Sequence, residues 1–421
     1  MKALSKPLRI ALFTDDFYPA SGGISRSIQA QINELVRLGH KVTLLAPKHY
    51  LEKPKDCETI ILPSFYIPRT PSHTCVVRHD RFLARRISRE HRFDIVHSQT
   101  ERGGLILAAR IAKIQQIPHV HTFHANLAGT HETDPVMSFW GSLAYFLLVN
   151  PSIALTSKKR IKSNVIIPAS HSDAPSFPAR FDWHSLATVA SRVDAFSAPA
   201  NFMVKRISEC SDELNGRGVT IPTGVNPLLR AAIQRNEDKT TKDEETRFLS
   251  VCRLSREKRV DVIIEAFIDA RIENSRLDIV GSGDQLKALQ KLAKDHNNII
   301  FHEHLSDMDD IARLYLSADV FVLASYKFDT QAITIAEAVV AGLPVIYCDE
   351  RLDVGVTPDN SILASSHRSS DMAVAMKQLA DKDTRARLAE ASRKIAPHLT
   401  SDQMANQYME LYRQATNRHI K

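Results

Sequence analysis

The clearest structural pattern in the chain lies between Phe321 and Val345, where the sequence reads FVLASYKFDTQAITIAEAVVAGLPV. A short apolar run is followed by a polar loop, by a helical segment that stops at Gly342, and by a second apolar run. A strand, a loop, a helix ended by glycine and another strand make one β-α-β unit. The stretch therefore predicts parallel strands joined by a covering helix.

The same alternation of short apolar runs and longer helical segments extends in both directions. In the second half, strands are predicted at 247–251, 276–280, 299–302, 320–324 and 344–348, with a helix at 260–270. In the first half, strands are predicted at 9–14, 41–46, 94–98, 119–123 and 195–198, with a helix at 24–37. We therefore expect an α/β protein with two doubly wound parallel sheets.

The length of the chain and a charged stretch near its middle indicate two domains. A chain of 421 residues is longer than one hydrophobic core usually organises. The stretch RNEDKTTKDEE at 235–245 is charged and nearly free of apolar residues, as expected of a linker. We expect an N-terminal domain at 1–225, a linker at 226–246 and a C-terminal domain at 247–400.

Composition limits the kinds of partner and compartment. Lys and Arg number 55 against 48 Asp and Glu, which favours anionic partners such as nucleotide phosphates or acidic lipid surfaces. No nucleic acid partner is expected. The five cysteines are scattered and never form a C-x-x-C pair, which argues against a disulfide framework or a zinc cluster and favours the reducing cytoplasm. The first apolar run stops at Asp15 and is too short for a signal-peptide core.

One segment has the character of a membrane-surface element. No apolar run approaches the roughly 18 to 20 residues that a membrane-spanning helix needs. The run LAYFLLV at 143–149 is, however, followed by the basic cluster KKRIK at 158–162. An apolar patch beside a basic cluster is typical of a segment on an anionic membrane. A core helix followed by a solvated loop explains the same residues, so both interpretations stay open.

Open α/β sheets bind ligands at the carboxyl ends of their strands, so the loops after strands are searched for chemistry. Gly22 and Gly23 precede a helix and would let backbone N–H groups approach an anion, although the pair could also simply shape a turn. Arg253 and Lys258 follow the first strand of the second half, where two cations suit a pyrophosphate. A solvated charged loop is the simpler explanation for those two.

Two further patterns follow strands of the second half. Gly281 and Gly283 form a G-x-G turn, which is weak evidence by itself. Asp329 lies on a loop and Glu337 about one turn into the next helix, where a helix N-terminus can meet phosphate and a carboxylate can accept hydrogen bonds from sugar hydroxyls. An acid in a first helical turn also stabilises the helix, which is the structural alternative.

Taken in their order, these segments resemble the retaining GT-B glycosyltransferases often called family 4. The matching segments are Gly22-Gly23 with 35–42, IPTGVN at 221–226, RLSREK at 253–258, IVGSG at 279–283 and the stretch 329–344. The resemblance implies two Rossmann-like domains facing across a cleft and a nucleotide-sugar donor. It also implies that residues 401–421 form a helix that packs back on the N-terminal domain.

The resemblance assigns roles to residues of the second half. Arg253 and Lys258 would hold the donor pyrophosphate, Glu337 would bind the nucleotide ribose, and Asp329 would touch hydroxyls of the transferred sugar. The backbone N–H groups of the loop after Asp329 would lie near the sugar and phosphate: Thr330, Gln331 and Ala332.

In the first half, His124 matches the family's active-site histidine near the C6 hydroxyl of the sugar. His121 is a nearby second candidate, and a core histidine is the alternative for either. Three positions depart from the family pattern. Asp329 stands where Glu is usual, and Cys252 and Glu303 each stand where the family has a glycine. Asp329 is one methylene shorter than Glu, so we expect a shifted sugar contact. The changes at Cys252 and Glu303 do not remove a charged ligand, so we expect activity to survive.

The resemblance further implies front-face attack, in which the acceptor oxygen enters on the side from which the nucleoside diphosphate leaves. No divalent metal and no cofactor are expected. The pair Thr330-Gln331 is similar to the Thr-Gln of bacterial diacylglycerol glucosyltransferases. Together with the segment at 143–162 and the basic charge balance, it favours a lipid acceptor and peripheral attachment to the inner face of the plasma membrane. A UDP-sugar is the favoured donor. A glycan acceptor, a nucleotide-sugar epimerase and a non-catalytic nucleotide-sugar-binding subunit stay open as alternatives.

Overall fold

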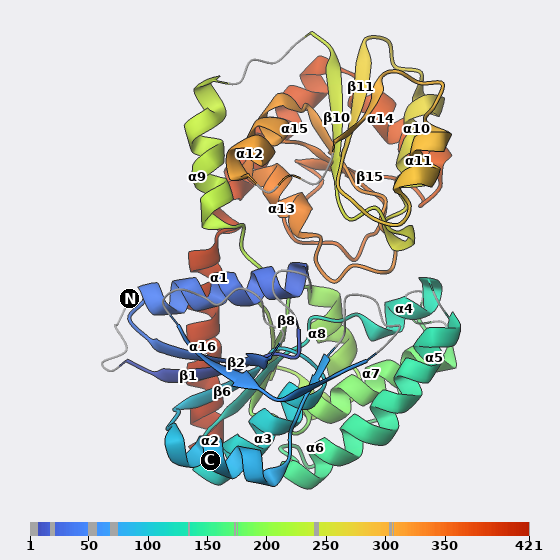
Figure 1. Cartoon of the computed structure of the whole chain (residues 1–421). Helices are drawn as coiled ribbons and strands as arrows, with labels where there is room; N and C mark the ends of the chain where they lie inside the picture. The colour runs from blue at the N-terminus through green and yellow to red at the C-terminus, as the bar shows by residue number, and fades with distance from the viewer. Residues whose placement is uncertain are drawn as a thin grey trace. The chain divides into compact units, whose positions relative to one another are not determined.

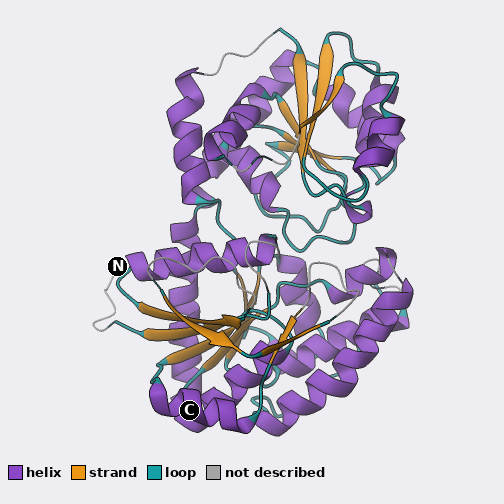
Figure 2. Ribbon diagram, in the orientation of Figure 1, coloured by secondary structure: helices purple, strands orange, loops and turns teal. Residues whose placement is uncertain are grey.

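The computed structural model describes residues 7–16, 22–48, 57–67, 75–133, 135–171, 174, 176–239, 244–302, 305 and 307–420. The chain divides into two compact units. Unit 1 comprises Met1–Thr223 with Ser401–Lys421, and unit 2 comprises Gly224–Thr400. Each unit is an α/β structure built on one parallel sheet (Figures 1 and 2).

The sheet of unit 1 has seven parallel strands in the order β3-β2-β1-β6-β7-β8-β9. The strands are β1 (Arg9–Phe13), β2 (Lys41–Pro47), β3 (Glu58–Leu62), β6 (Ile95–Ser98), β7 (His119–Thr122), β8 (Ala195–Ala198) and β9 (Gly218–Thr220). A separate antiparallel pair joins β4 (Ser64–Tyr66) to β5 (Cys75–Val77). The strand order reverses between β1 and β6, so the carboxyl ends of these two strands flank the position where such sheets bind ligands.

Helices cover both faces of this sheet (Figure 2). They are α1 (Gly23–Arg37), α2 (Arg81–Glu90), α3 (Gly103–Gln115), α4 (Leu127–Thr133), α5 (Pro135–Ala144), η2 (Tyr145–Val149), α6 (Asn150–Thr156), α7 (Phe177–Ala190), α8 (Asn201–Ser208), η3 (Asp212–Leu214) and α16 (Ser401–Ile420). Successive side chains of a strand point to opposite faces. In β1, Ile10 and Leu12 accordingly join a core with α1 and α16, whereas Ala11 and Phe13 join a core with α2 and α3.

The C-terminal helix α16 belongs to unit 1, the unit on which the sequence analysis expected it to pack. Its Tyr408 and Tyr412 are fully buried against the sheet. The Tyr412 hydroxyl oxygen accepts a hydrogen bond from Gln31 Nε2 at 2.9 Å and lies 2.8 Å from His97 Nδ1. Polar contacts inside the core therefore fix the position of α16 on the sheet.

The sheet of unit 2 has six parallel strands in the order β12-β11-β10-β13-β14-β15. The strands are β10 (Thr246–Val251), β11 (Ser275–Val280), β12 (Ile299–His302), β13 (Val320–Val322), β14 (Val345–Tyr347) and β15 (Ser361–Leu363). Its order reverses between β10 and β13, so the loops that follow these two strands flank the ligand position of this sheet.

Helices also cover both faces of the second sheet (Figure 2). They are α9 (Pro227–Asn236), η4 (Glu237–Lys239), η5 (Arg256–Lys258), α10 (Val260–Ala270), α11 (Leu286–Leu292), α12 (Met308–Ser317), α13 (Ile333–Val340), α14 (Ser369–Gln378), α15 (Lys382–Ile395) and η6 (Ala396–His398). In β10, Phe248 joins a core with α10 and α14, whereas Leu249 joins a core with α9, α12 and α13. Both sheets therefore have the doubly wound architecture that the sequence predicts.

The expected linker at 226–246 is wrong for its first half, which forms helix α9 of unit 2. Asn226 caps this helix, because its side chain accepts a hydrogen bond from Leu228 N at 2.9 Å. Leu229, Ala232 and Ile233 are buried on one side of the helix, which packs against α12. Their spacing of three and four residues makes a helical apolar stripe, which the charged residues after it obscured.

The predicted central strands are observed within one or two residues, whereas several edge strands were missed. The missed strands are β3, β9 and β15, which lie at edges of the two parallel sheets, and the antiparallel pair β4 and β5. The edge strands β3 and β9 are largely half-buried, so they lack the continuous apolar run by which central parallel strands are recognised.

One helix among the described residues, Pro135–Thr156, is long and apolar enough by length and composition to cross a membrane. The sequence analysis expected none, because isolated polar residues interrupt the apolar run while the helix continues through α5, η2 and α6. One side of this helix is buried within unit 1 through Tyr145, Ile153 and Thr156. Its exposed apolar side chains are Val136, Met137, Phe139, Trp140, Leu147, Leu148 and Leu155.

Candidate functional site

The site of unit 2 is built from loops that follow adjacent strands. Arg253 comes two residues after β10, and Lys258 closes the short helix η5 on the same loop. Asp329 lies on the loop that follows β13, the strand that pairs with β10. Because both strands are parallel, their carboxyl ends meet at one edge of the sheet, where the strand order reverses.

Lys258 and Asp329 form the central contact of this site. Lys258 Nζ donates a hydrogen bond to Asp329 Oδ1 at 2.6 Å, and the two side chains are only 16% and 11% exposed. The second oxygen, Asp329 Oδ2, is buried without a hydrogen-bond partner among the described residues. A buried carboxylate oxygen without a partner can accept a hydrogen bond from a ligand hydroxyl.

Arg253 is held differently from Lys258. Its guanidinium Nη2 donates to Glu257 Oε1 at 2.9 Å, and its side chain is 52% exposed. Ser255 Oγ donates to the same Glu257 oxygen at 2.7 Å. The charge of Arg253 is therefore half-exposed to solvent, whereas the charge of Lys258 is mostly buried.

The two glycines after β11 allow two loops to touch. A side chain at Gly281 would place its Cβ 1.9 Å from the carbonyl oxygen of Cys252, and one at Gly283 would place it 2.1 Å from that of Leu254. Leu254 N donates to Ser282 O at 2.9 Å, which joins the loops directly. The glycines thus hold the Arg253 loop in place, a packing role that the sequence pattern did not reveal.

The residues Thr330, Gln331 and Ala332 lead into helix α13, which begins at Ile333. Ala332 provides no side-chain cap for this helix. Glu337 lies one turn into the helix and is buried, and its Oε2 accepts a hydrogen bond from the Tyr315 hydroxyl at 2.8 Å. A buried carboxylate with a fixed orientation is a suitable acceptor for ligand hydroxyls.

Asp349, which the sequence analysis missed, fixes the same loop from the neighbouring strand. Asp349 lies after β14 and is buried with Arg351, whose Nη2 donates to it at 2.7 Å. It also accepts a hydrogen bond from Lys327 N at 2.7 Å. Lys327 has a φ of 55°, so this bond stabilises an unfavourable backbone conformation two residues before Asp329. An acid directly after a predicted strand was the available signal.

In unit 1, His124 lies two residues beyond β7 and is buried. Its Nε2 lies 2.8 Å from Gln99 Oε1, and Gln99 Nε2 in turn donates to Gln31 Oε1 at 2.7 Å. Since the amide oxygen accepts, the proton resides on Nε2 of His124. Burial lowers the pKa of His124 to about 4, so the imidazole is neutral near pH 7.

His121, the second candidate, lies within β7 and belongs to the core. Its Nδ1 is 2.8 Å from Ser98 Oγ, which is also 2.8 Å from His119 Nε2. Burial, followed by the neighbouring histidines, lowers the pKa of His121 well below its ordinary value. Of the two candidates, His124 has the better position for a ligand because it lies on the loop beyond the strand.

Gly22 and Gly23 begin helix α1. Gly22 precedes the helix with a φ of 68°, a conformation that favours glycine, and Gly23 is its first residue. Both are exposed. Residues 17–21, which precede Gly22, and Glu303, which stands where the family has a glycine, lie outside the described residues.

Polar residues at the ends of β1 and β6 were also missed. Asp15 is fully engaged, since its Oδ2 accepts from Thr100 Oγ1 at 2.7 Å and from Gly104 N at 2.8 Å. Asp16 pairs with Arg102 at 2.6 Å. Glu101 is buried, its Oε1 has no partner among the described residues, and burial raises its pKa to about 7. These residues form a second polar cluster at the switch point of unit 1.

The structure thus brings Lys258 and Asp329 into contact, while Arg253 and Glu337 make ion-pair or hydrogen-bond contacts of their own in unit 2. Gly22, Gly23 and His124 belong to unit 1. Across the described part of the chain, no group of three or more His, Cys, Asp or Glu side chains is arranged to hold a metal ion.

Comparisons of the sequence with known proteins identify the family of this chain. Residues 21–227 match the sequence model of Glycosyltransferase Family 4, and residues 233–395 match that of Glycosyl transferases group 1. The chain is 26% identical over 359 residues to the alpha-monoglucosyldiacylglycerol synthase of Streptococcus pneumoniae, covering 80% of this chain and 70% of that protein. It is 25% identical over 361 residues to the protein of the same name from Acholeplasma laidlawii, covering 80% of each.

Solved structures share the fold at lower identity. HepE of Anabaena, solved in complex with UDP, has a TM-score of 0.66 at 15% identity and covers 96% of this chain and 99% of its own. WaaG, a glycosyltransferase involved in lipopolysaccharide biosynthesis, has a TM-score of 0.59 at 15% identity, with 96% and 99% covered. With its two doubly wound sheets and its two successive family matches, the chain belongs to the GT-B glycosyltransferases of the family 4, group 1 type.

Proposed function

We propose that this glycosyltransferase moves a hexose, with retention of configuration, from a nucleotide-sugar donor to a hydroxyl group of a membrane lipid, with UDP-sugars favoured. The observation that carries the proposal is the buried Lys258–Asp329 pair at the carboxyl edge of the second sheet. In this pair, a cation that suits a diphosphate lies beside a carboxylate oxygen for which no described residue is a hydrogen-bond partner. Two relatives named alpha-monoglucosyldiacylglycerol synthase support the lipid acceptor.

In the proposed reaction, unit 2 binds the donor by charge and by hydrogen bonds. Lys258 and the exposed Arg253 neutralise the departing diphosphate, which lowers the barrier for cleavage of the sugar–phosphate bond. Asp329 Oδ2 accepts a hydrogen bond from a hydroxyl of the sugar, and Glu337 accepts from the ribose hydroxyls. Asp329 is one methylene shorter than the usual Glu, so the sugar would lie closer to the loop.

The acceptor oxygen attacks the anomeric carbon on the face from which the diphosphate leaves, and an oxygen of the leaving phosphate takes its proton. This route needs no covalent nucleophile, divalent metal or cofactor, because Lys258 and Arg253 supply the positive charge. Because the Nε2–H of the neutral imidazole is donated to Gln99, His124 would accept a hydrogen bond from a sugar hydroxyl at Nδ1. It does not act as a cation near neutral pH, since burial lowers its pKa to about 4.

We further propose that the protein works in the cytoplasm as a peripheral protein on the inner face of the plasma membrane. The helix Pro135–Thr156 supports this, because one side is buried in unit 1 while bulky apolar side chains such as Trp140 and Leu148 are exposed on it. A helix with this exposure suits the membrane interface, where tryptophan is favoured.

The test combines donor binding with product analysis. Purified protein is melted with UDP-, GDP- and ADP-glucose, as wild type, as Arg253→Ala and as the control Lys377→Ala, an exposed cation on α14. A shift with one nucleotide that only Arg253→Ala abolishes is the expected result. Radiolabelled sugar should then enter diacylglycerol vesicles in chelator-containing buffer, with the anomeric configuration of the donor retained.

Each part of the proposal can fail separately. A requirement for added metal would overturn the charge assignment to Lys258 and Arg253. Label found only in water-soluble product would replace the lipid acceptor by a glycan. Conversion of the donor sugar without acceptor would indicate an epimerase. The absence of both a nucleotide shift and any transfer would indicate a non-catalytic binding subunit.

A further inference from the structure

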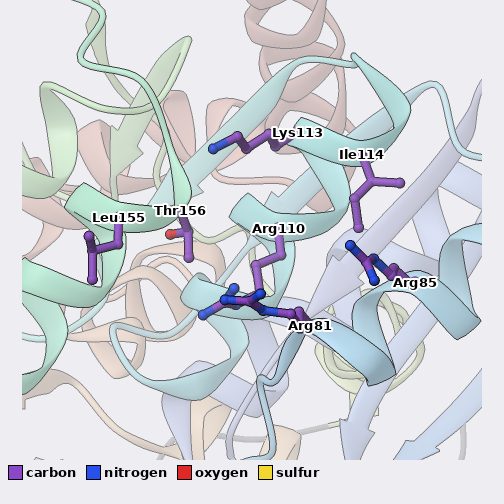
Figure 3. A pocket seen from close by; sticks show the side chains of 7 residues that line it. All are labelled: Arg81, Arg85, Arg110, Lys113, Ile114, Leu155 and Thr156. Carbon is purple, nitrogen blue, oxygen red and sulfur yellow. The ribbon is translucent and has the colours of Figure 1, made fainter.

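A basic pocket of about 250 Å³ lies on unit 1 beside the C-terminal end of helix Pro135–Thr156 (Figure 3). Its lining residues come from helices α2, α3 and α6 and are Arg81, Arg85, Arg110, Lys113, Ile114, Leu155 and Thr156. Four of these are cations and none is an acid. The sequence analysis did not single out any of the four.

The charge of this pocket is countered only in part by the described residues, of which Asp80 acts on Arg110. Among the described residues, none of the four side chains forms an ion pair or a hydrogen bond. Arg110 Nε is buried, and no described residue gives it a hydrogen-bond partner. Burial, and then the neighbouring charge of Arg81, lowers the pKa of Arg110, and the charge of Asp80 opposes this shift. Figure 3 shows the Arg81 and Arg110 side chains reaching toward the same space.

Repulsion among these cations lowers the stability of helices α2 and α3. Arg81 and Arg85 are four residues apart on α2, and Arg110 and Lys113 are three apart on α3, so each pair repels along one helix face. Asp80, the acid whose charge acts on Arg110, is already engaged: it caps α2 by accepting from Phe82 N and Leu83 N and also pairs with Arg78. An anion bound between the four cations would relieve the repulsion.

The apolar wall of the pocket points to the source of that anion. Leu155 lines the pocket and is 81% exposed, and Leu148 lies seven residues earlier, about two turns away on the same side of the helix. An interfacial helix places its apolar face at the boundary between acyl chains and headgroups. A pocket at the end of such a face lies at the level of the lipid phosphates.

We propose that this pocket binds the phosphate group of an anionic phospholipid while the exposed apolar side chains of Pro135–Thr156 enter the acyl boundary. The inference rests on the proposed action at a membrane, which it deepens by naming the lipid class and the residues that select it. A bound headgroup would fix unit 1 at the membrane surface, so that lipid acceptors can reach it by lateral diffusion.

The test measures binding of the full chain to vesicles, without donor or acceptor. Vesicles of pure phosphatidylcholine are compared with vesicles in which a third of the lipid is phosphatidylglycerol. The pocket variant Arg81→Gln/Arg110→Gln is compared with Arg86→Gln/Arg89→Gln, which removes the same charge from exposed positions of α2 outside the pocket. Far-ultraviolet circular dichroism and the thermal shift with nucleotide sugar show whether each variant is folded.

Wild type should bind the anionic vesicles and not the neutral ones. Each neutralised cation near an anionic surface lowers affinity about fivefold, so the pocket variant should lose roughly 30-fold. The control variant should lose clearly less, since its charges do not surround one phosphate. The difference between the two variants should persist at raised salt, because charges gathered around one bound phosphate are screened less than exposed ones.

Three outcomes would contradict the proposal that this pocket binds a lipid phosphate. Equal losses in the two variants would mean that general surface charge attracts the membrane. If inorganic phosphate raised the melting temperature of the protein as much as the phosphatidylglycerol vesicles did, and the vesicles did not recruit the protein, the pocket would be a site for free phosphate. Equal binding of wild type to neutral and anionic vesicles would mean that apolar contact alone suffices. The proposed function fails by a different measurement, the transfer of labelled sugar.

Discussion

Replacing Lys258 by methionine tests the central pair of the donor site. The substitution keeps most of the apolar stem and removes the ammonium group, which donates to Asp329 Oδ1 at 2.6 Å. Asp329 would then be left at 11% exposure with neither oxygen hydrogen-bonded by a described residue. Breaking a fully buried pair from one side costs about 3–5 kcal/mol, so we expect a loss of about 2–3 kcal/mol here.

The double variant Lys258→Met/Asp329→Asn separates this stability effect from catalysis. Replacing the carboxylate by an amide removes the unpaired charge, so the free energy of unfolding should return to within about 1 kcal/mol of wild type. The rate of sugar transfer should nevertheless stay low. Loss of one preorganised positive group at a developing negative charge lowers kcat by roughly 100- to 1,000-fold.

The assay is urea unfolding of wild type, both single variants and the double variant, followed by steady-state transfer from the donor identified by thermal shift. If the double variant is as unstable as Lys258→Met, an unpaired Asp329 is not the cause of the instability. If Lys258→Met keeps kcat within a factor of about ten, Lys258 does not stabilise the leaving diphosphate.

Three further predictions concern the supports of the site and the core of unit 1. Gly283→Ala should lower stability by about 1–3 kcal/mol and abolish the nucleotide thermal shift, because its Cβ would lie 2.1 Å from Leu254 O; an unchanged shift would contradict this. Tyr315→Phe should lower stability by about 1.5–3 kcal/mol in urea unfolding, since Glu337 loses a 2.8 Å hydrogen bond. Burial lowers the pKa of His119 to about 3, so as the pH falls the unfolded chain takes up a proton before the folded chain does. The contribution of His119 to stability is therefore complete above pH 6.5, and the free energy of unfolding should fall by up to about 1.4 kcal/mol per pH unit down to pH 3. Melting temperatures that stay constant from pH 7 to about pH 4 would contradict that last expectation.

Local pattern was a good guide to the central strands and to the order of the motifs. Strand β8 and helix α10 have the predicted limits, and β1, β2 and β7 differ by one residue. A buried parallel strand is apolar on both faces, so it stands out from its neighbours. The edge strands β3 and β9 and the helix α9 were missed because they are half-buried or lie beside charged residues.

The candidate site was only partly accessible from sequence. Lys258 and Asp329 were both singled out, but their pairing across 71 residues was not. The G-x-G turn was weak evidence by itself, and the sequence did not show that Gly283 makes room for the backbone of Leu254. Asp349 and the basic pocket were not found, because their meaning depends on neighbours that are distant in the chain.

The sequence by itself determined the fold class, the alternation of strands and helices and the family, because each depends on local apolar periodicity or on the order of short motifs. Tertiary structure alone decided that Lys258 meets Asp329, that Asp349 fixes the loop that carries Asp329, and that four cations from α2 and α3 line one pocket. The physical reason is that burial and charge balance depend on which strands become neighbours. That information is shared among segments far apart in the chain, and no single segment contains it.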